Sequence, residues 1–308
     1  MSASVAFVKM HGCGNDYVFL DCFSQPAPAD PAAFARHVSD RHRSIGADGL
    51  VLMLPADEPG VAGRMRMFNA DGSEGAMCGN ALRCFAMWLH QTQRAPTSFV
   101  LAMAQRRIPV TIVTSDPCRQ QASVRLAMGA PESRVPGSVS FSDCVHSVLL
   151  PGISITGLRS PGTHVSMGNP HTVFFVNRLD ELPFADLGPA VECHAQFPQR
   201  TNVEFVEISG PEEVRVRVWE RGSGETLACG SGACAVVVAG MASGLVTPYQ
   251  TTTVRMAGGD LRVSIDETLQ VFLEGPAEEC CRGTVQWPQQ AANTAVLGNA
   301  VTHREVSA

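Results

Sequence analysis

The stretch Phe68-Asn-Ala-Asp-Gly-Ser-Glu-Gly-Ala-Met-Cys78-Gly-Asn80 aligns without gaps on Trp219-Glu-Arg-Gly-Ser-Gly-Glu-Thr-Leu-Ala-Cys229-Gly-Ser231. Each copy starts with an aromatic residue at a strand end, passes through a Gly/Ser turn, and reaches a Cys-Gly pair four residues after a Glu. The residues that follow each Cys have apolar positions at helical spacing. The same strand, turn and helix unit is therefore expected twice.

A second pair of motifs repeats at a similar distance. Gly14-Asn15-Asp16-Tyr17-Val18 matches Gly168-Asn169-Pro170-His171-Thr172, an offset of 154 residues, and the two Cys-Gly pairs are 151 residues apart. Two motifs in the same order, at nearly one offset of about half the chain, indicate an internal repeat. We expect two homologous halves that face each other across a cleft and present their cysteines as a pair.

Short β-rich runs separated by Gly, Pro and Asp turns dominate the chain, which predicts an α+β fold. The predicted strands are Val5–Lys9, Tyr17–Cys22, Leu50–Leu54, Arg64–Phe68, Arg107–Val113, Ser123–Met128, Thr172–Val176, Val203–Ile208, Val214–Trp219, Thr252–Met256, Leu261–Ile265 and Leu269–Leu273. The predicted helices are Pro31–Arg41, Gly79–Gln93 and Gly232–Ser243.

The composition restricts the class of partner. The 308 residues are 45% hydrophobic with a formal charge of −6, as expected for one large or two medium globular domains. The arginines are scattered, which argues against a nucleic acid or membrane partner. Lys9 is the only lysine, so a Schiff-base cofactor and a Walker-type phosphate loop are not expected. The uncharged stretch 226–253 is rich in Gly, Ser and Thr, which favours a buried helix over a membrane span.

The N-terminus and the cysteines predict the compartment. Residues 1–10 lack the basic region and apolar run of a secretory signal, so we expect a cytoplasmic protein. Eleven cysteines, an odd number, argue against a disulfide framework. No Cys-x-x-Cys occurs and the histidines are scattered, so no metal site is expected.

The two Cys-Gly pairs suggest acid–base chemistry. A thiol beside the first turn of a helix is expected to have a lowered pKa, and the same backbone amides can bind a carboxylate. Two such helix ends in one cleft would hold a small carboxylic acid with a sulfur on each face of its α-carbon. One thiolate would remove the α-proton and the other thiol would return a proton, which is a racemase or epimerase reaction without metal or cofactor. Small buried residues are the alternative interpretation of Cys78 and Cys229.

Polar residues at strand ends are the other candidates, with simpler alternatives. The asparagines are also typical of turns that bond their own backbone, and His171 of a surface residue. Glu220 and Arg221 form either an exposed ion pair or a binding site for an amino-acid head group. The asparagines are Asn15, Asn69, Asn169 and Asn202.

In sum, the motifs resemble those of the diaminopimelate epimerase family, in family order from about Val5 to Trp287. They are Met10-His-Gly-Cys-Gly-Asn-Asp-Tyr17, Arg41-His-Arg-Ser-Ile-Gly-Ala-Asp48, Phe68-Asn-Ala-Asp-Gly-Ser-Glu74, Met77-Cys-Gly-Asn80, Met167-Gly-Asn-Pro-His171, Arg200-Thr-Asn202 and Glu220-Arg-Gly-Ser-Gly-Glu-Thr-Leu-Ala-Cys-Gly-Ser-Gly-Ala-Cys234.

The resemblance implies two pseudo-symmetric domains, each a rolled, mostly antiparallel sheet around a central helix, with the C-terminal strand returning to the first domain. On this basis we expect one half from residues 1–129 with 275–287, the other from 130–274, and a mobile tail at 288–308. The implied reaction interconverts LL- and meso-diaminopimelate, for lysine and peptidoglycan synthesis, in a homodimer.

The resemblance also implies residue roles, position by position. Cys78 and Cys229 are the implied acid/base pair, assisted by His171 and Glu220. Helix-start amides of Gly79, Asn80, Gly230 and Ser231 are implied to bind the α-carboxylate. The implied substrate-binding side chains are Asn15, Asn69, Asn169, Asn202, Glu220 and Arg221.

Several positions depart from the family pattern. Ala81 stands where Gly is usual, Ser231 where Thr is common and Tyr17 where Phe is common, while Gly49 replaces a Gln that binds substrate in some members. Another amino acid as substrate is the main alternative, histidine before proline. A non-catalytic binding protein is the alternative from a different class.

Overall fold

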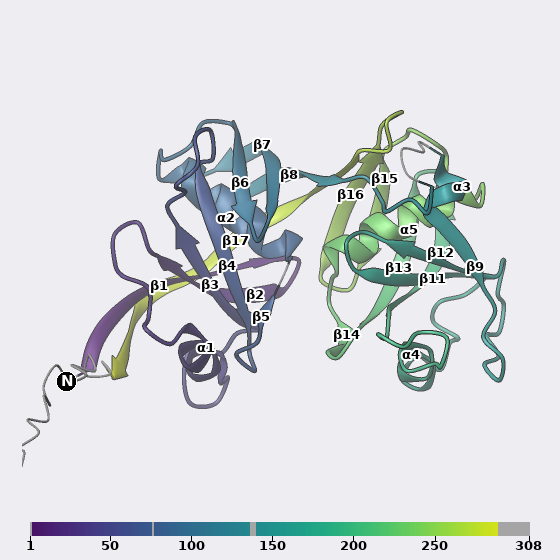
Figure 1. Ribbon diagram of the computed structural model, residues 1–308, viewed down its shortest axis with the longest axis horizontal. Helices are drawn as coiled ribbons and strands as arrows, with labels where there is room; N and C mark the ends of the chain where they lie inside the picture. Colours follow the sequence, from purple (N-terminus) through teal and green to yellow (C-terminus); the bar gives the residue numbers. More distant parts are fainter. Residues whose placement is uncertain (1, 76, 136–139, 289–308) are drawn as a thin grey trace, which may run out of the picture.

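The computed structural model describes residues 2–75, 77–135 and 140–288, which form two lobes side by side (Figure 1). The helices are α1 (Pro31–Ser39), α2 (Gly79–Gln91), α3 (Phe141–Cys144), α4 (Phe184–Glu192) and α5 (Gly230–Ala242). One lobe holds α1 and α2, and the other holds α3, α4 and α5.

The strands of the described residues form one continuous hydrogen-bonded sheet that rolls around each lobe. They are β1 (Ser2–Gly12), β2 (Asn15–Asp21), β3 (Gly49–Leu54), β4 (Gly63–Asn69), β5 (Glu74–Gly75), β6 (Ser98–Met103), β7 (Arg106–Asp116), β8 (Gln121–Gly129), β9 (Val145–Val148), β10 (Gly162–Ser166), β11 (Pro170–Val176), β12 (Asn202–Gly210), β13 (Glu213–Glu220), β14 (Gly224–Thr226), β15 (Thr252–Met256), β16 (Gly259–Ile265) and β17 (Val271–Pro288).

The two lobes repeat one topology. In the first lobe β2 pairs with β3 and β4 with β6 in parallel, and in the second β11 pairs with β12 and β13 with β15 in parallel. The other strand pairs are antiparallel, apart from these four. The register repeats too, since Tyr17 lies opposite Gly49 and His171 opposite Asn202. The predicted α+β fold of two pseudo-symmetric, mostly antiparallel halves is therefore confirmed.

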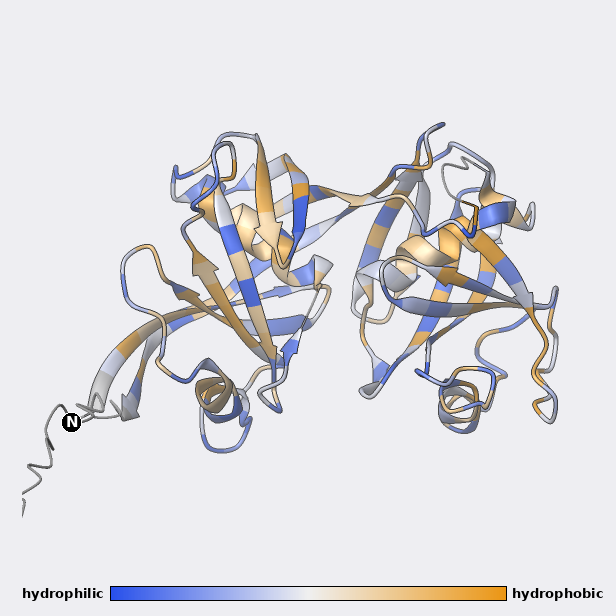
Figure 2. Ribbon diagram, in the orientation of Figure 1, coloured by the Kyte–Doolittle hydropathy of each residue, from blue (hydrophilic) through white to orange (hydrophobic). Residues whose placement is uncertain are grey.

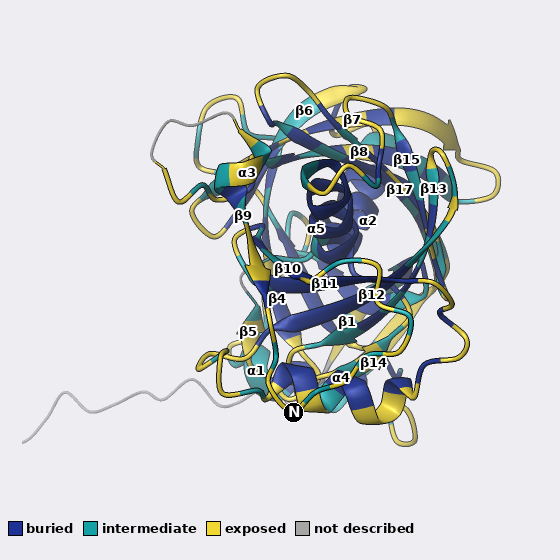
Figure 3. Cartoon of the chain, turned by 90° about the vertical axis from the view of Figure 1, so that its right-hand side faces the viewer, coloured by how far each residue is buried: buried dark blue, intermediate teal, exposed yellow. Residues whose placement is uncertain are grey.

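A buried helix fills the centre of each roll, α2 in the first lobe and α5 in the second (Figure 3). Helix α5 is apolar on all sides and consists mainly of Gly, Ala and Val, a pattern typical of a helix surrounded by protein (Figure 2). Helix α2 starts at Gly79 as predicted, and α5 starts at Gly230, two residues before the predicted Gly232, because the Cys before each Gly adopts extended backbone and caps the helix.

The two central helices meet at their N-terminal ends. A Cβ added to Gly230 would lie 3.9 Å from the Cα of Gly79. The same hypothetical atom on Gly79 and Gly230 would approach Leu273 Cδ2 to 3.3 Å and 2.9 Å, respectively. Glycine at both helix starts therefore permits close contact over one leucine of β17.

Strand β17 joins the lobes. Its first residues, 271–274, pair with β16 of the second lobe, and residues 271–278 pair with β8. The remainder, 278–288, runs alongside β1 at the far end of the first lobe (Figure 1). The strand that the resemblance returns to the first half is thus one long element shared by both lobes.

Some element boundaries differ from those expected. The strand predicted at Leu269 starts at Val271, because Leu269 has φ 62° in a turn closed on Asp266. Helix α1 ends at Ser39, since the Asp40 carboxylate accepts hydrogen bonds from the backbone amides of His42 and Arg43. Several elements were not predicted from the sequence, namely α3, α4, β5, β6, β9, β10 and β14.

The predicted tail begins at the end of β17. Pro288 is the last residue of that strand, opposite Ser2, and residues 289–308 lie outside the described part of the chain. The domain boundaries expected after residues 129 and 274 stay predictions. Within the described residues, none of the helices is long and apolar enough to cross a membrane.

Replacing Leu273 by Ala should lower the free energy of unfolding by about 2–5 kcal/mol, because the side chain is fully buried under both helix starts. Urea denaturation followed by circular dichroism measures the change. Leu149→Ala is the matched control, since Leu149 is 71% exposed and should change stability by less than about 0.5 kcal/mol. Equal effects of the two substitutions would contradict this packing.

Candidate active site

A cavity of about 1010 Å³ lies where the two helix starts meet, between the lobes. All the site residues expected from the sequence line it, with His171 as the exception: Asn15, Asn69, Cys78, Gly79, Asn80, Asn169, Asn202, Glu220, Arg221, Cys229, Gly230 and Ser231. Residues separated by half the chain therefore line one cavity, as the repeat predicted.

The two cysteines occupy equivalent positions at this cavity. Cys78 Sγ accepts a hydrogen bond from the Ala81 amide and Cys229 Sγ from the Gly232 amide, each at 3.4 Å. Each sulfur is thus the side-chain cap of its helix, where the unpaired amides and the helix dipole favour negative charge. Each lobe contributes one of the two sulfurs.

The expectation of lowered thiol pKa values is wrong for this structure. Burial raises the pKa of Cys78 above its ordinary value of 9.0, although the Ala81 amide and Tyr17 oppose the shift. Burial, followed by the Glu220 and Glu204 carboxylates, raises the pKa of Cys229 well above that value. The loss of hydration outweighs the helix amides at both sulfurs, so burial favours the protonated thiol at each of them.

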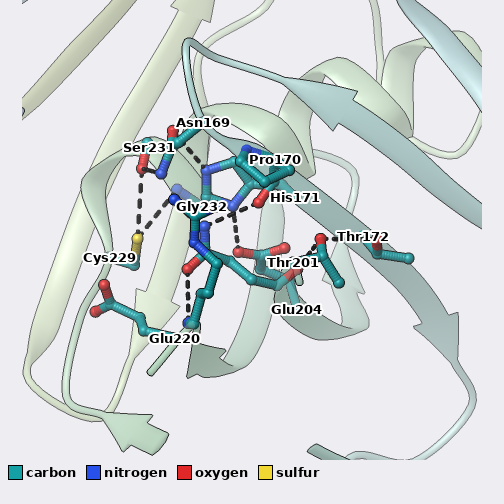
Figure 4. Close-up of polar contacts among 12 residues, drawn as sticks. Asn169, Pro170, His171, Thr172, Thr201, Glu204, Glu220, Cys229, Ser231 and Gly232 are labelled. Atoms are coloured by element: carbon teal, nitrogen blue, oxygen red, sulfur yellow. Dashed lines mark hydrogen bonds and ion pairs between the residues drawn. The ribbon is translucent and has the colours of Figure 1, made fainter. Parts of the chain in front are cut away.

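Cys229 has a carboxyl group and a hydroxyl group beside it. Ser231 Oγ lies 3.5 Å from its sulfur, and Glu220 stands next to it at the end of β13 (Figure 4). Glu220 accepts a hydrogen bond of 2.6 Å from Thr226 Oγ1, and burial raises the pKa of its carboxyl group. A carboxylate with a raised pKa in this place is suited to exchange a proton with the thiol.

His171 lies beneath the cavity wall. Its side chain is fully buried, with Nδ1 2.6 Å from Glu204 Oε1 and Nε2 3.1 Å from Asn169 Oδ1. The Asn169 amide nitrogen donates to Ser231 Oγ at 3.2 Å, which fixes the orientation of its oxygen toward the ring. Both ring nitrogens thus face oxygen acceptors, and His171 connects to Cys229 through Asn169 and Ser231 (Figure 4).

Cys78 has a different environment. Its sulfur lies 3.7 Å from Tyr17 Oη and 3.6 Å from Asn15 Oδ1. Asn15 is held by two bonds, since its amide nitrogen donates to Asp48 at 2.8 Å and its oxygen accepts from Asn80 at 3.1 Å. The Asn80 amide nitrogen also lies 3.4 Å from the Ala228 carbonyl oxygen, a contact from one lobe to the other.

The cavity is also lined by an exposed cation. Arg221 donates from its guanidinium to the Gln199 carbonyl oxygen at 3.1 Å, and no carboxylate lies within ion-pair distance of it in the described part of the chain. Asn202 Oδ1 accepts from the Arg221 backbone amide at 2.9 Å and so fixes this loop. Asn69, from the other lobe, faces the same space. The arrangement is suited to a second charged group on a ligand.

At Gly49 a side chain cannot be accommodated. A Cβ there would lie 2.1 Å from the Phe68 carbonyl oxygen and 3.0 Å from Tyr17 Cε1. Any substrate contact made by a side chain at this position is therefore absent. Ala81 is fully buried inside α2 and does not face the cavity, so its methyl group is compatible with the site.

Sequence reasoning missed a buried cation. Arg83 of α2 is fully buried and donates to the Pro276 oxygen at 3.1 Å and to Asn80 Oδ1 at 2.8 Å. Its Nη1 has no hydrogen-bond partner, and none of the described carboxylates pairs with it. This guanidinium is one of the groups that oppose the rise in the pKa of Cys78. Only its place one turn beyond the Cys-Gly pair offered a signal.

Two other polar residues were also missed. Glu204, the partner of His171, sits within a run of apolar strand residues, and Asp48, the partner of Asn15, appeared in the sequence only as part of a motif. A metal site was not expected, and the described residues hold no group of three or more His, Cys, Asp or Glu side chains placed to bind one.

The chain is similar over most of its length to one protein family. The diaminopimelate epimerase family matches the chain at residues 7–132 and 163–279. A diaminopimelate epimerase of Pelotomaculum thermopropionicum is 44% identical over 283 residues, covering 90% of this chain and 97% of the relative. One from Bacillus cereus is 41% identical over 291 residues, covering 93% and 99%.

Solved structures with lower identity share the fold. A predicted epimerase from Pseudomonas aeruginosa superimposes with a TM-score of 0.68 at 18% identity, covering 91% of this chain and 99% of its own. A probable proline racemase from Agrobacterium radiobacter gives a TM-score of 0.63 at 16% identity, with 94% of each chain covered. At these identities the likeness concerns the fold alone.

Alkylation of the free protein by iodoacetamide should modify Cys78 before Cys229. Carboxylates raise the pKa of Cys229 further, and its sulfur is the more deeply buried. Because both values are raised, each rate should still increase with pH at about pH 9, where peptide mapping by mass spectrometry follows both sites. Exposed Cys118 provides the reference reaction.

Modification of Cys229 first, or a plateau of both rates below about pH 8, would contradict the environments described for the two sulfurs.

Proposed function

The chain belongs to the diaminopimelate epimerase family, an isomerase family of lysine biosynthesis, and we propose that Cys78 and Cys229 invert the α-carbon of LL-diaminopimelate to give the meso form. The observation that carries this proposal is the pair of equivalent sulfurs, one from each lobe, on the wall of one cavity. Each sulfur caps a helix whose first amides face the same space.

The helix starts supply the site for the α-carboxylate. Backbone amides of Gly79, Asn80, Gly230 and Ser231 lie at positions whose N–H groups have no partner within their helices. Removal of the α-proton moves an electron pair onto the carboxylate, and fixed amides stabilise this developing charge. Arg83, behind the same helix start, adds a buried positive charge.

The proton transfers balance without a redox partner. The thiolate on one face of the α-carbon takes its proton, and the thiol on the other face gives a proton to the same carbon. The enzyme ends with thiol and thiolate exchanged. Glu220 beside Cys229 is placed to hold the proton that leaves that thiol before the reaction. His171 orients Asn169 and Ser231 and acts as a positioning residue.

Recognition of the substrate's distal end by the cavity selects diaminopimelate among amino acids. This substrate carries a second ammonium and carboxylate pair, and the cavity is lined by further cations and carboxylates, including Arg221, Arg41 and Asp48. Arg221 is the one whose guanidinium has carbonyl contact only. We assign it to the distal carboxylate, with Asn69 and Asn202 beside it.

We also infer from the family resemblance a cytoplasmic homodimer that takes a small amino-acid substrate. Light scattering after size exclusion tests the mass of the assembly. A monomer at micromolar concentration would overturn this part of the proposal.

Cys78→Ala and Cys229→Ala should each reduce epimerisation of LL-diaminopimelate by at least about 10²-fold, since each removes one acid–base group. Reductant is present and no cofactor is added, and NMR follows the conversion to the meso isomer. Cys193→Ala, at an exposed position outside the cavity, is the control and should keep full activity. L-Histidine and L-proline are tested beside diaminopimelate.

Conversion of histidine or proline alone would overturn the substrate assignment. Full activity of either cavity variant would overturn the two-cysteine mechanism.

Arg221→Met should raise KM for diaminopimelate by about tenfold or more and change kcat less, because the group binds a part of the substrate that does not react. Steady-state kinetics provide both constants. Arg178→Met is the control, since Arg178 pairs with Glu181 on the surface. A fall in kcat at constant KM would contradict a distal role for Arg221.

A further inference from the structure

The repeat relates Tyr17 to His171. Each lies two residues after the Asn of a Gly-Asn pair, Tyr17 as the third residue of β2 and His171 as the second residue of β11, and the two positions are 154 residues apart. In the register of the parallel pairs, Tyr17 faces Gly49 and His171 faces Asn202. The two lobes therefore place different side chains at one structurally equivalent point below each cysteine.

The supporting asparagines are equivalent as well. Asn169 bonds Ser231, two residues beyond Cys229, and Asn15 bonds Asn80, two residues beyond Cys78. In the second lobe, His171 connects to the sulfur of Cys229 only through Asn169 and Ser231. In the first lobe, Tyr17 Oη lies directly beside the sulfur, at 3.7 Å.

We propose that the Tyr17 hydroxyl donates a hydrogen bond to the Cys78 thiolate and so stabilises it during the reaction. This inference rests on the proposed function, because it assigns a role in the proton transfers of the same site. It concerns the sulfur that has no carboxylate within hydrogen-bond distance among the described residues.

The donors and acceptors around Cys78 Sγ support this role. The Ala81 amide donates, while Asn15 presents an oxygen that suits the protonated thiol. Asn15 cannot turn its amide nitrogen to the sulfur, because Asp48 and Asn80 fix its orientation. Among the described side chains that contact this sulfur, Tyr17 is thus the one that can donate to a thiolate.

Tyr17 remains a phenol under working conditions. Burial raises its pKa well above the ordinary value of 10.0, and the neighbouring Cys78 and Asp48 raise it further. A group that keeps its proton is a donor to the thiolate and does not compete as a base. The other charged groups that face this sulfur are Glu220, which opposes the thiolate, and Arg83, which favours it.

The ring is held in place for this contact. Tyr17 is 5% exposed and packs edge-on against Phe19, with ring centroids 6.4 Å apart. Gly49 permits the close packing, because a Cβ there would stand 3.0 Å from the ring. A fixed donor stabilises the charged sulfur without reorganisation.

Tyr17→Phe removes the hydroxyl and keeps the ring, which makes it the direct test. In the free enzyme, iodoacetamide should alkylate Cys78 about tenfold more slowly at pH 8, and the pH dependence of that rate should move to higher pH. The rate at Cys229 should not change. Tyr249→Phe is the matched control, since Tyr249 is the other tyrosine of the chain and is exposed.

Kinetics complete the test. Tyr17→Phe should lower kcat/KM for diaminopimelate by about tenfold, and the rise of kcat/KM with pH should occur at higher pH than in the parent enzyme. The thermal stability of the variant should be close to that of the parent. An unchanged alkylation rate at Cys78 would overturn the inference even if the enzyme is an epimerase. Alkylation requires no turnover, so it tests the role of Tyr17 independently of the proposed function. Failure of the proposed function would be seen in a different experiment, as an active Cys78→Ala variant.

Discussion

The contact between two helix starts over Leu273 is the constraint on which the site depends. Helices α2 and α5 belong to different lobes, yet their first glycines approach closely enough that a side chain on either would meet the same leucine. Each helix is capped by the sulfur of a cysteine. Packing that stabilises the fold thereby also places the two thiols at one cavity, with the unpaired amides of both helices directed toward the same ligand.

The repeated architecture holds unequal chemistry. Around Cys229 lie Glu220 and the chain from Glu204 through His171, whereas Cys78 has Tyr17 and the fixed amide of Asn15. Two halves of common topology thus provide sulfurs with different proton affinities. A two-base reaction needs one thiolate and one thiol at the same time. Unequal surroundings favour one of the two possible distributions of the proton between the sulfurs over the other.

Much of the fold could be predicted from the repeat. The Cys-Gly pairs located the starts of α2 and α5 to within two residues, and alternating apolar residues located most strands. Helix α4 was missed because Gly188 and Pro189 lie inside it, where helix propensity is poor. Leu269 was assigned to a strand because it is apolar; its side chain is indeed buried, but its backbone lies in a turn.

The sequence predicted most of the residues that line the cavity, but it predicted the electrostatics of the cavity less well. Spacing brought the cysteines and asparagines together, but the sign of the thiol pKa shifts depends on how much water the folded lobes exclude, which no motif reports. His171 was expected at the cavity and lies below it, because its strand is buried on both faces. Arg83 and Glu204 are buried charges whose importance arises from tertiary surroundings.

The position of solvent deuterium in the first products tests the two-sulfur account most directly. LL-Diaminopimelate is incubated in deuterated buffer, and NMR or mass spectrometry at low conversion determines the isotope at the α-carbon of each isomer. If one sulfur removes the proton and the other delivers one from solvent, the new meso product carries deuterium while recovered substrate keeps its proton. Equal labelling of both isomers at low conversion, or meso product that retains the original proton, would contradict the account.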